Sequence, residues 1–285
     1  MIAITGATGQ LGRLVIDALL TRVPANQIVA AVRSPAKAQD LAAKGVIVRE
    51  ADYSRPDTLV SALTGIDKLL LISSNEIGQR AVQHQAVIDA AKQAGVKLVA
   101  YTSVLHADRS PLGLAEEHRQ TEAALKAAGL PHVLLRNGWY TENYLASVPS
   151  ALQYGVLMGS AADGRIASAS RRDYAEAAVA VLTAPDNQAG KVYELAGDSA
   201  YTLSELAGEV ARQSGKTVTY NHLPEAEFKA MLVSVGLPEP LAQLLADSDA
   251  GAARGALFDD GGQLRRLIGR PTTPMKESLA AALKG

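Results

Sequence analysis

Short apolar and β-branched runs alternate with amphipathic segments through the first half of the chain. Six of these runs predict strands: Ile2–Thr5, Ile28–Arg33, Val46–Arg49, Lys68–Ile72, Lys97–Ser103 and His132–Arg136. The clearest helix is expected directly after Gly9. Its apolar positions recur at helical spacing: Leu11, Leu14, Val15, Ala18 and Leu19. Alternating strands and helices predict an α/β fold of the Rossmann type, with a doubly wound parallel sheet.

The regular alternation fades after Trp139, where Gly and Pro punctuate shorter elements. We therefore predict a first domain over residues 1–145 and a smaller C-terminal lobe over residues 146–285. A helix is expected over Tyr174–Leu182 and a strand over Val192–Leu195. Because both lie within residues 166–198, part of that segment is expected to pack back onto the first domain.

Composition narrows the class of protein. The 285 residues carry 28 Lys and Arg against 29 Asp and Glu, so no overall positive charge favours nucleic acid. Apolar residues make up 48% of the chain, enough for a substantial core, but no run approaches the ~20 residues of a membrane helix. Cysteine is absent, which excludes thiolate chemistry. Because Met1 to Leu11 also lack a signal-peptide pattern, we expect a cytoplasmic protein without membrane insertion.

A glycine pattern follows the first predicted strand. Its residues are Gly6, Ala7, Thr8, Gly9, Gln10, Leu11 and Gly12, with the first helix directly behind them. Gly6 permits a tight exit from the strand, Gly9 lets backbone N–H groups approach a pyrophosphate, and Gly12 permits close packing of helix and strand. The spacing G-x-x-G-x-x-G between a strand and a helix predicts a dinucleotide site. Residues 1–145 are therefore the predicted dinucleotide-binding domain, and the lobe over residues 146–285 is expected on the side of the substrate.

Arg33 occupies the end of the second predicted strand, where NAD-binding proteins carry Asp or Glu for the ribose 2′-hydroxyl. A guanidinium suits a 2′-phosphate instead, so Arg33 predicts NADPH as the cofactor, with assistance from Lys37. The alternative is a solvated arginine beside Ser34 and Pro35. Asp52, past the third strand, has two interpretations: a contact to the adenine amino group, or a turn before the helix that Ser54 and Pro56 begin.

Three polar residues, Ser73, Ser74 and Asn75, follow the fourth predicted strand. They lie where open α/β sheets bind ligands, so we expect them to contact the cofactor. Asn75 is also a candidate N-cap for a helix predicted over residues 76–94.

These motifs occur together with Ser103 at the end of the fifth strand and with the run Arg136-Asn137-Gly138-Trp139-Tyr140 after the sixth. The combination resembles the NmrA-like branch of the atypical short-chain dehydrogenases/reductases. Within that branch, Tyr101-Thr102-Ser103, the run from Leu135 to Leu145 and Tyr193-Glu194-Leu195-Ala196-Gly197-Asp198 resemble the bacterial NADPH-dependent quinone oxidoreductases of type 2. The likeness covers nearly the whole chain.

The resemblance implies further contacts with the cofactor. It assigns them to Ser103, His118, Asn137, Gly138, Trp139, Tyr140, Thr141, Glu142 and Ser168. Tyr140 and Asn143 are expected on the side of the substrate, with Asn143 bonded to a carbonyl oxygen. His118 has a second interpretation, because its spacing from Leu114, Thr121 and Leu125 is also that of a buried core histidine.

Ordinary short-chain reductases protonate their product with a Tyr-x-x-x-Lys pair, and none of the nine tyrosines here has Lys four residues on. Reducing a ketone leaves a strongly basic alkoxide, whereas reducing a quinone leaves a phenolate that water can protonate, since a phenol pKa is about 10. The missing pair therefore favours a quinone substrate and direct hydride transfer, with no catalytic acid assigned.

Other functions fit the sequence less well. The five histidines, at positions 84, 106, 118, 132 and 222, form no H-x-x-x-H pair, so no metal site is expected. A sugar-nucleotide epimerase would need the missing Tyr-x-x-x-Lys. The main alternative is a nonenzymatic NADP-binding redox sensor, a function that the resemblance also allows. The sequence leaves the oligomeric state open.

Overall fold

The computed structural model describes residues 1–284, which form two compact units. The first unit comprises residues 1–107, 116–137 and 171–193. The second comprises residues 108–115, 138–170 and the chain from 194 onward. Neither unit is a continuous stretch of chain, since residues 171–193, which lie within the segment 166–198 expected to pack back, belong to the first unit. The boundary at residue 145 stays a prediction.

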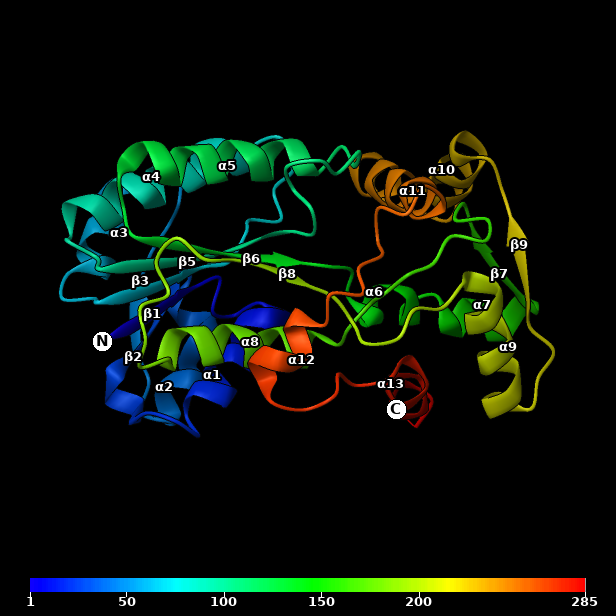
Figure 1. Ribbon diagram of the computed structural model, residues 1–285, viewed down its shortest axis with the longest axis horizontal. Coiled ribbons are helices and arrows are strands. Elements are labelled where there is room, and N and C mark those ends of the chain that lie inside the picture. Colours follow the sequence, from blue (N-terminus) through cyan, green and yellow to red (C-terminus); the bar gives the residue numbers. More distant parts are fainter. Residues whose placement is uncertain (285) are drawn as a thin grey trace. The chain divides into compact units, whose positions relative to one another are not determined.

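A seven-stranded sheet organises the first unit (Figure 1). Its strands are β1 (Ile2–Thr5), β2 (Ile28–Val32), β3 (Ile47–Glu50), β4 (Lys68–Leu71), β5 (Leu98–Val104), β6 (His132–Asn137) and β8 (Val192–Leu195). The order is β3-β2-β1-β4-β5-β6-β8, and the pairs from β3 to β6 are all parallel. The chain order reverses between β1 and β4, the switch point at which doubly wound sheets bind ligands. The predicted α/β class and strands are confirmed to within one or two residues.

Helices cover both faces of this sheet. Figure 1 shows α3, α4 and α5 on one face and α1, α2 and α8 on the other. Their bounds are α1 (Gln10–Leu19), α2 (Gln39–Ala43), α3 (Pro56–Leu63), α4 (Arg80–Gln93), α5 (Ala115–Ala128) and α8 (Arg171–Thr183), with short 3₁₀ turns at η1 (Ala25–Gln27) and η2 (Pro35–Ala38). Strands β1, β2 and β5 are buried along their whole length because both faces are covered.

The segment before α4 differs from the prediction. The helix expected over residues 76–94 begins only at Arg80, with Gln79 as its N-cap, so the N-cap assigned to Asn75 is wrong. Residues 76–79 form a turn in which the Gln79 N–H donates to the Glu76 carbonyl (3.1 Å). Gly78 has φ +82°, a left-handed conformation that interrupts a helix.

The second unit contains a small sheet and short helices. Strands β7 (Val156–Gly159) and β9 (Thr219–His222) pair in parallel. The helices are α6 (Thr141–Leu145), α7 (Val148–Tyr154), α9 (Leu203–Ser214), α10 (Glu225–Ser234), α11 (Glu239–Ala253), α12 (Gln263–Ile268) and α13 (Met275–Ala282). Asp249 of α11 ties this unit together, since it accepts hydrogen bonds from the Tyr144 hydroxyl (2.9 Å) and the Ser160 N–H (3.0 Å). Within residues 1–284, every helix is too short or too polar to cross a bilayer.

Candidate cofactor site

The carboxyl ends of β1 to β6 meet at one edge of the sheet because neighbouring strands run parallel. The register pairs Thr5 with Ala31 and Val32 with Glu50. It also pairs Leu71 with Tyr101 and Val104 with Asn137. The residues predicted from the first unit follow these ends: the glycine turn, Arg33, Asp52, Ser73 to Asn75, and Asn137. The structure therefore brings these loops to a common edge.

The glycine turn is too tight for larger residues. Gly6 has φ +58°, which glycine adopts without a steric penalty. A Cβ atom on Gly12 would lie 2.4 Å from the Gly6 carbonyl oxygen and 2.7 Å from the Ala7 Cα, and one on Gly9 would lie 3.1 Å from that same oxygen. The three glycines thus let the loop close on itself, and Gly6 and Gly9 stay exposed. The turn from Gly6 to Gly12 forms a compact cradle, and Cβ atoms on its glycines would fill the space inside it.

Helix α1 begins in this cradle with its N-terminus open. Its N-cap is Gly9, which supplies no side-chain acceptor, and the first turn carries no acidic residue. Helix N-terminal N–H groups and the helix dipole attract anions. The turn therefore fits a pyrophosphate, as the sequence predicts for Gly6 to Gly12.

Arg33 lies just past the end of β2 and its side chain is 72% exposed. Its Nη1 lies 3.0 Å from Glu76 Oε1. The guanidinium is therefore accessible to an anion at the sheet edge, and one of its five N–H donors is engaged by a carboxylate. Sequence reasoning missed Glu76, because it lies 43 residues away in the loop after β4.

Asp52 takes part in a turn. Its Oδ1 accepts the Ser54 N–H (2.9 Å), and its carbonyl accepts the Arg55 N–H (2.9 Å). The structure supports the turn interpretation of Asp52, and helix α3 follows with Pro56 in its first turn. A contact to adenine stays a prediction.

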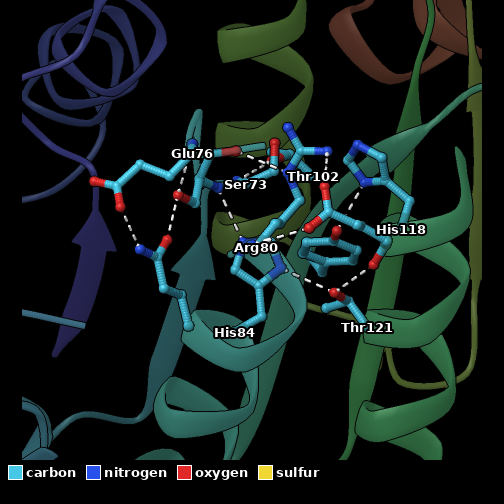
Figure 2. A network of polar contacts seen from close by, with 11 residues as sticks. Ser73, Glu76, Arg80, His84, Thr102, His118 and Thr121 are labelled. Atoms are coloured by element: carbon cyan, nitrogen blue, oxygen red, sulfur yellow. Dashed lines mark hydrogen bonds and ion pairs between the residues drawn. The ribbon is translucent and has the colours of Figure 1, made fainter. Parts of the chain in front are cut away.

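A polar network holds the loop after β4 (Figure 2). The Ser73 N–H donates to Thr102 Oγ1 and the Ser74 N–H to His84 Nε2, both at 2.9 Å. Arg80 Nε donates to the Ser74 carbonyl at 2.7 Å. Asn75 is exposed in this loop. The predicted serines therefore sit on a backbone that side chains of α4 fix in place.

The two histidines of this network are buried and neutral. Because His84 Nε2 accepts from Ser74, its proton lies on Nδ1, 2.9 Å from Thr121 Oγ1. His118 Nδ1 lies 2.7 Å from the Tyr101 hydroxyl. Burial, with the nearby Arg80 charge, lowers the pKa of His84 to about 3 and that of His118 well below its usual range. These contacts agree with a core role for His118, and its contact with the cofactor stays a prediction.

These buried histidines predict an acid-sensitive fold. The unfolded chain binds protons below about pH 6.5 that the folded chain does not, so stability is complete above that pH and falls as the pH drops. Each histidine should contribute about 1.4 kcal/mol per pH unit. Denaturant titrations between about pH 5 and pH 7.5 measure this slope. His84→Gln should reduce this slope, because it removes one of the two groups that the folded chain keeps neutral. An unchanged slope in His84→Gln would contradict the assignment.

Ser103 at the end of β5 donates its hydroxyl proton to Glu122 Oε1 (2.6 Å). Arg136 of β6 holds the same carboxylate with two bonds, Nε to Oε1 (3.0 Å) and Nη2 to Oε2 (2.7 Å). Both charged side chains are nearly buried. With its proton directed to Glu122, the Ser103 hydroxyl presents its acceptor lone pairs to a cofactor. Glu122 was not predicted, because nothing local in the sequence of α5 marks it as an inward-facing charge.

Asn137 ends β6 with a buried amide oxygen, Oδ1, that has no hydrogen-bond partner within residues 1–284. A buried acceptor of this kind is costly unless a donor satisfies it. An N–H or O–H of a ligand at the sheet edge would do so. This orphaned atom and the glycine cradle are the two features that fit a bound dinucleotide.

The predicted residues of the second unit form a set of their own. The Gly138 N–H donates to the Leu195 carbonyl (2.7 Å), and Trp139 is buried with its ring 6.4 Å from that of Tyr144. Thr141 Oγ1 lies 2.8 Å from Ser168 Oγ, which in turn lies 2.7 Å from the Tyr201 hydroxyl. Tyr140, Glu142 and Asn143 are half-buried. Hydrogen bonding therefore joins Thr141 to Ser168, while roles toward cofactor or substrate stay predictions.

The NmrA-like family model matches residues 1–260. The chain belongs to the NmrA-like family. This family membership confirms the resemblance stated from the sequence. Among curated proteins, it is 63% identical over 280 residues to Quinone oxidoreductase 2 of Escherichia coli (strain K12), covering 98% of each chain.

Solved structures of two reductases are similar to this chain. The crystal structure of an NADPH-dependent quinone oxidoreductase from Escherichia coli, complexed with NADPH, matches with a TM-score of 0.97 and 62% identity, covering 99% of this chain and 100% of that one. A triphenylmethane reductase from Citrobacter sp., complexed with NADP(H), matches with a TM-score of 0.94 and 39% identity, with coverage of 99% and 100%. Both similar proteins are reductases with a phosphorylated nicotinamide cofactor.

Proposed function

We propose that this NmrA-like protein is an oxidoreductase that uses NADPH to reduce quinones. The observation that carries the proposal is 63% identity over 98% of the chain to a quinone oxidoreductase, in a fold whose sheet edge fits a dinucleotide. This near-full-length identity favours an enzyme over a redox sensor. We also place it in the cytoplasm, where its sequence led us to expect it.

The residues of the chain would hold the cofactor as follows. The turn from Gly6 to Gly12 and the N-terminus of α1 bind the pyrophosphate. Arg33 binds the 2′-phosphate through its guanidinium, which selects NADPH over NADH. Asn137 Oδ1 accepts a hydrogen bond from the cofactor. When bound, NADPH supplies the hydride.

No side chain is needed as an obligatory acid. A quinone that receives a hydride becomes a hydroquinone anion, and one proton from water completes the hydroquinone. His84 and His118 are neutral near pH 7 and have ring nitrogens engaged within the core. Burial also raises the pKa of Tyr101 far above its usual value. The chain then accelerates the reaction by placing the two reactants against each other. Tyr140 and Asn143 are the proposed residues on the quinone side.

The proposal is tested by following NADPH oxidation with purified protein and a panel of benzoquinones, naphthoquinones, ketones and aldehydes. We expect turnover with the quinones alone, and faster turnover with NADPH than with NADH. Turnover of ketones would contradict the argument from the missing Tyr-x-x-x-Lys pair. Tight NADP(H) binding in calorimetry without turnover of any acceptor would favour the redox sensor.

A further inference from the structure

Glu76 holds the arginine that is proposed to receive the 2′-phosphate. We propose that Glu76 is a specificity-determining residue: its carboxylate competes with the 2′-phosphate for Arg33 and so weakens the preference for NADPH over NADH. This inference rests on the proposed function, since it needs Arg33 to bind the phosphate. It assigns to Glu76 a role opposite to that of its ion-pair partner.

The ion pair is open to solvent at the ligand edge of the sheet. Arg33 follows β2 and Glu76 lies in the loop after β4, and their side chains are 72% and 46% exposed. The distance from Arg33 Nη1 to Glu76 Oε1 is 3.0 Å. An anion that binds Arg33 therefore arrives beside an existing negative charge.

Glu76 is held more firmly than an ordinary surface glutamate. Its second oxygen, Oε2, accepts a hydrogen bond from Gln83 Nε2 (2.6 Å), and its N–H donates to Ser74 Oγ (3.2 Å). Ser74 Oγ donates in turn to Gln83 Oε1 (2.5 Å). Figure 2 shows Glu76 at one end of this network, which continues toward Arg80 and His84.

Buried residues of α4 keep the loop that carries Glu76 in place. Arg80 and Gln83 of α4 are buried, and Arg80 binds the Ser74 carbonyl while its own N–H donates to Glu117 Oε1 (3.0 Å). Glu76 thus has anchors that do not depend on Arg33. Arg33 can turn toward a ligand, but the carboxylate remains where the loop holds it.

A fixed carboxylate affects the two cofactors differently. The 2′-phosphate must share the guanidinium with Glu76 and is repelled by its charge, whereas the 2′-hydroxyl of NADH carries no charge. At about 4 Å, the interaction of two unit charges in water corresponds to a roughly fivefold change in a binding constant. Glu76 should therefore weaken NADPH binding by about that factor and leave NADH binding nearly unchanged.

The test variant is Glu76→Gln, which keeps the shape of the side chain and removes its charge. Calorimetry should show NADPH binding about fivefold tighter than in the wild type and NADH binding changed by less than about twofold. The gain should shrink at about 1 M salt, where charges are screened within ~3 Å. Adenosine 2′,5′-bisphosphate, which carries the 2′-phosphate, should also bind more tightly to Glu76→Gln than to the wild type. Adenosine 5′-phosphate, which lacks the 2′-phosphate, should bind both proteins equally.

The matched control is Asp67→Asn. Asp67 is also 46% exposed and also pairs with cations, the Lys97 ammonium group and the Met1 amino group, but it precedes β4 instead of following it. Asp67→Asn removes one negative charge, as Glu76→Gln does, but from the opposite edge of the sheet. Both cofactors should therefore bind as in the wild type. If Asp67→Asn tightens NADPH binding as Glu76→Gln does, the effect is one of net charge and the proposal fails.

Further outcomes separate this proposal from the proposed function. NADPH and NADH affinities that rise equally in Glu76→Gln, or weaker NADPH binding, would overturn the role of Glu76 alone. In Arg33→Ala, NADPH should lose at least tenfold in affinity while NADH loses little. Equal losses in Arg33→Ala would instead overturn the 2′-phosphate assignment on which both proposals depend.

Discussion

Replacing Gly12 with alanine is expected to lower the free energy of unfolding by about 3 kcal/mol and to weaken NADPH binding more than tenfold. The new Cβ atom would lie 2.4 Å from the Gly6 carbonyl oxygen and 2.7 Å from the Ala7 Cα. Because both neighbours are backbone atoms, neither can rotate away as a side chain would. Either α1 or the turn must shift, and the N–H groups at the start of α1 would shift with it.

Denaturant unfolding and calorimetric titration with NADPH measure the two effects. The matched control is Gly208→Ala, because a Cβ atom at Gly208 in α9 meets nothing within 4 Å. Alanine there should stabilise the protein by about 0.5–1 kcal/mol, the ordinary gain from removing a glycine inside a helix. Wild-type stability and wild-type affinity in Gly12→Ala would show that the turn does not need its glycine.

Replacing Glu122 with alanine is expected to cost about 3–5 kcal/mol, because the Arg136 guanidinium would lose its bidentate partner in a nearly buried setting. Ser103 would lose the acceptor of its hydroxyl proton as well. The change would therefore disturb the ends of β5 and β6 together, where the candidate site contains Ser103 and Asn137.

Equilibrium unfolding of Glu122→Ala measures this cost. Glu122→Gln keeps an acceptor for the Ser103 hydroxyl, so its free energy of unfolding should fall by less than that of Glu122→Ala. The control is Asp17→Ala, since the Asp17–Lys44 pair is about half exposed and such pairs contribute at most about 1 kcal/mol. If Glu122→Ala and Asp17→Ala are equally mild, solvent screens the Arg136–Glu122 pair far better than its burial indicates.

Local sequence patterns predicted the strands and the glycine turn, because their conformations depend on residues that are close together in the chain. The strands could be located because a covered parallel sheet needs apolar runs, and the glycine turn because its backbone tolerates few other residues. The helix after Asn75 began too early in the prediction because the predicted helix was continued through Gly78, a residue that disfavours helix. The left-handed turn at Gly78 ends that pattern, and its φ cannot be read from composition.

The polar partners could not be predicted, because each joins positions that are distant in the chain. Arg33 was recognised from its place after the second strand, but its pairing with Glu76 depends on β2 and β4 lying on either side of β1. Glu122 meets Arg136 and Ser103 because α5 packs over β5 and β6. The buried network of His84, Arg80 and His118 likewise follows from tertiary packing, which periodicity alone does not encode.

The first unit is complete only when helix α8, which is synthesised late, has packed against α1. Helix α8 packs against α1, and its Leu182 carbonyl accepts a hydrogen bond from the Lys68 ammonium group (2.6 Å). On the ribosome, residues 138–170 must therefore be translated before the helix that covers α1 exists. At about 5–20 residues per second, the stretch from Asn137 to Tyr193 takes roughly 3–11 seconds. During that interval, the nascent sheet has one incompletely covered face, which makes it a natural client for chaperones.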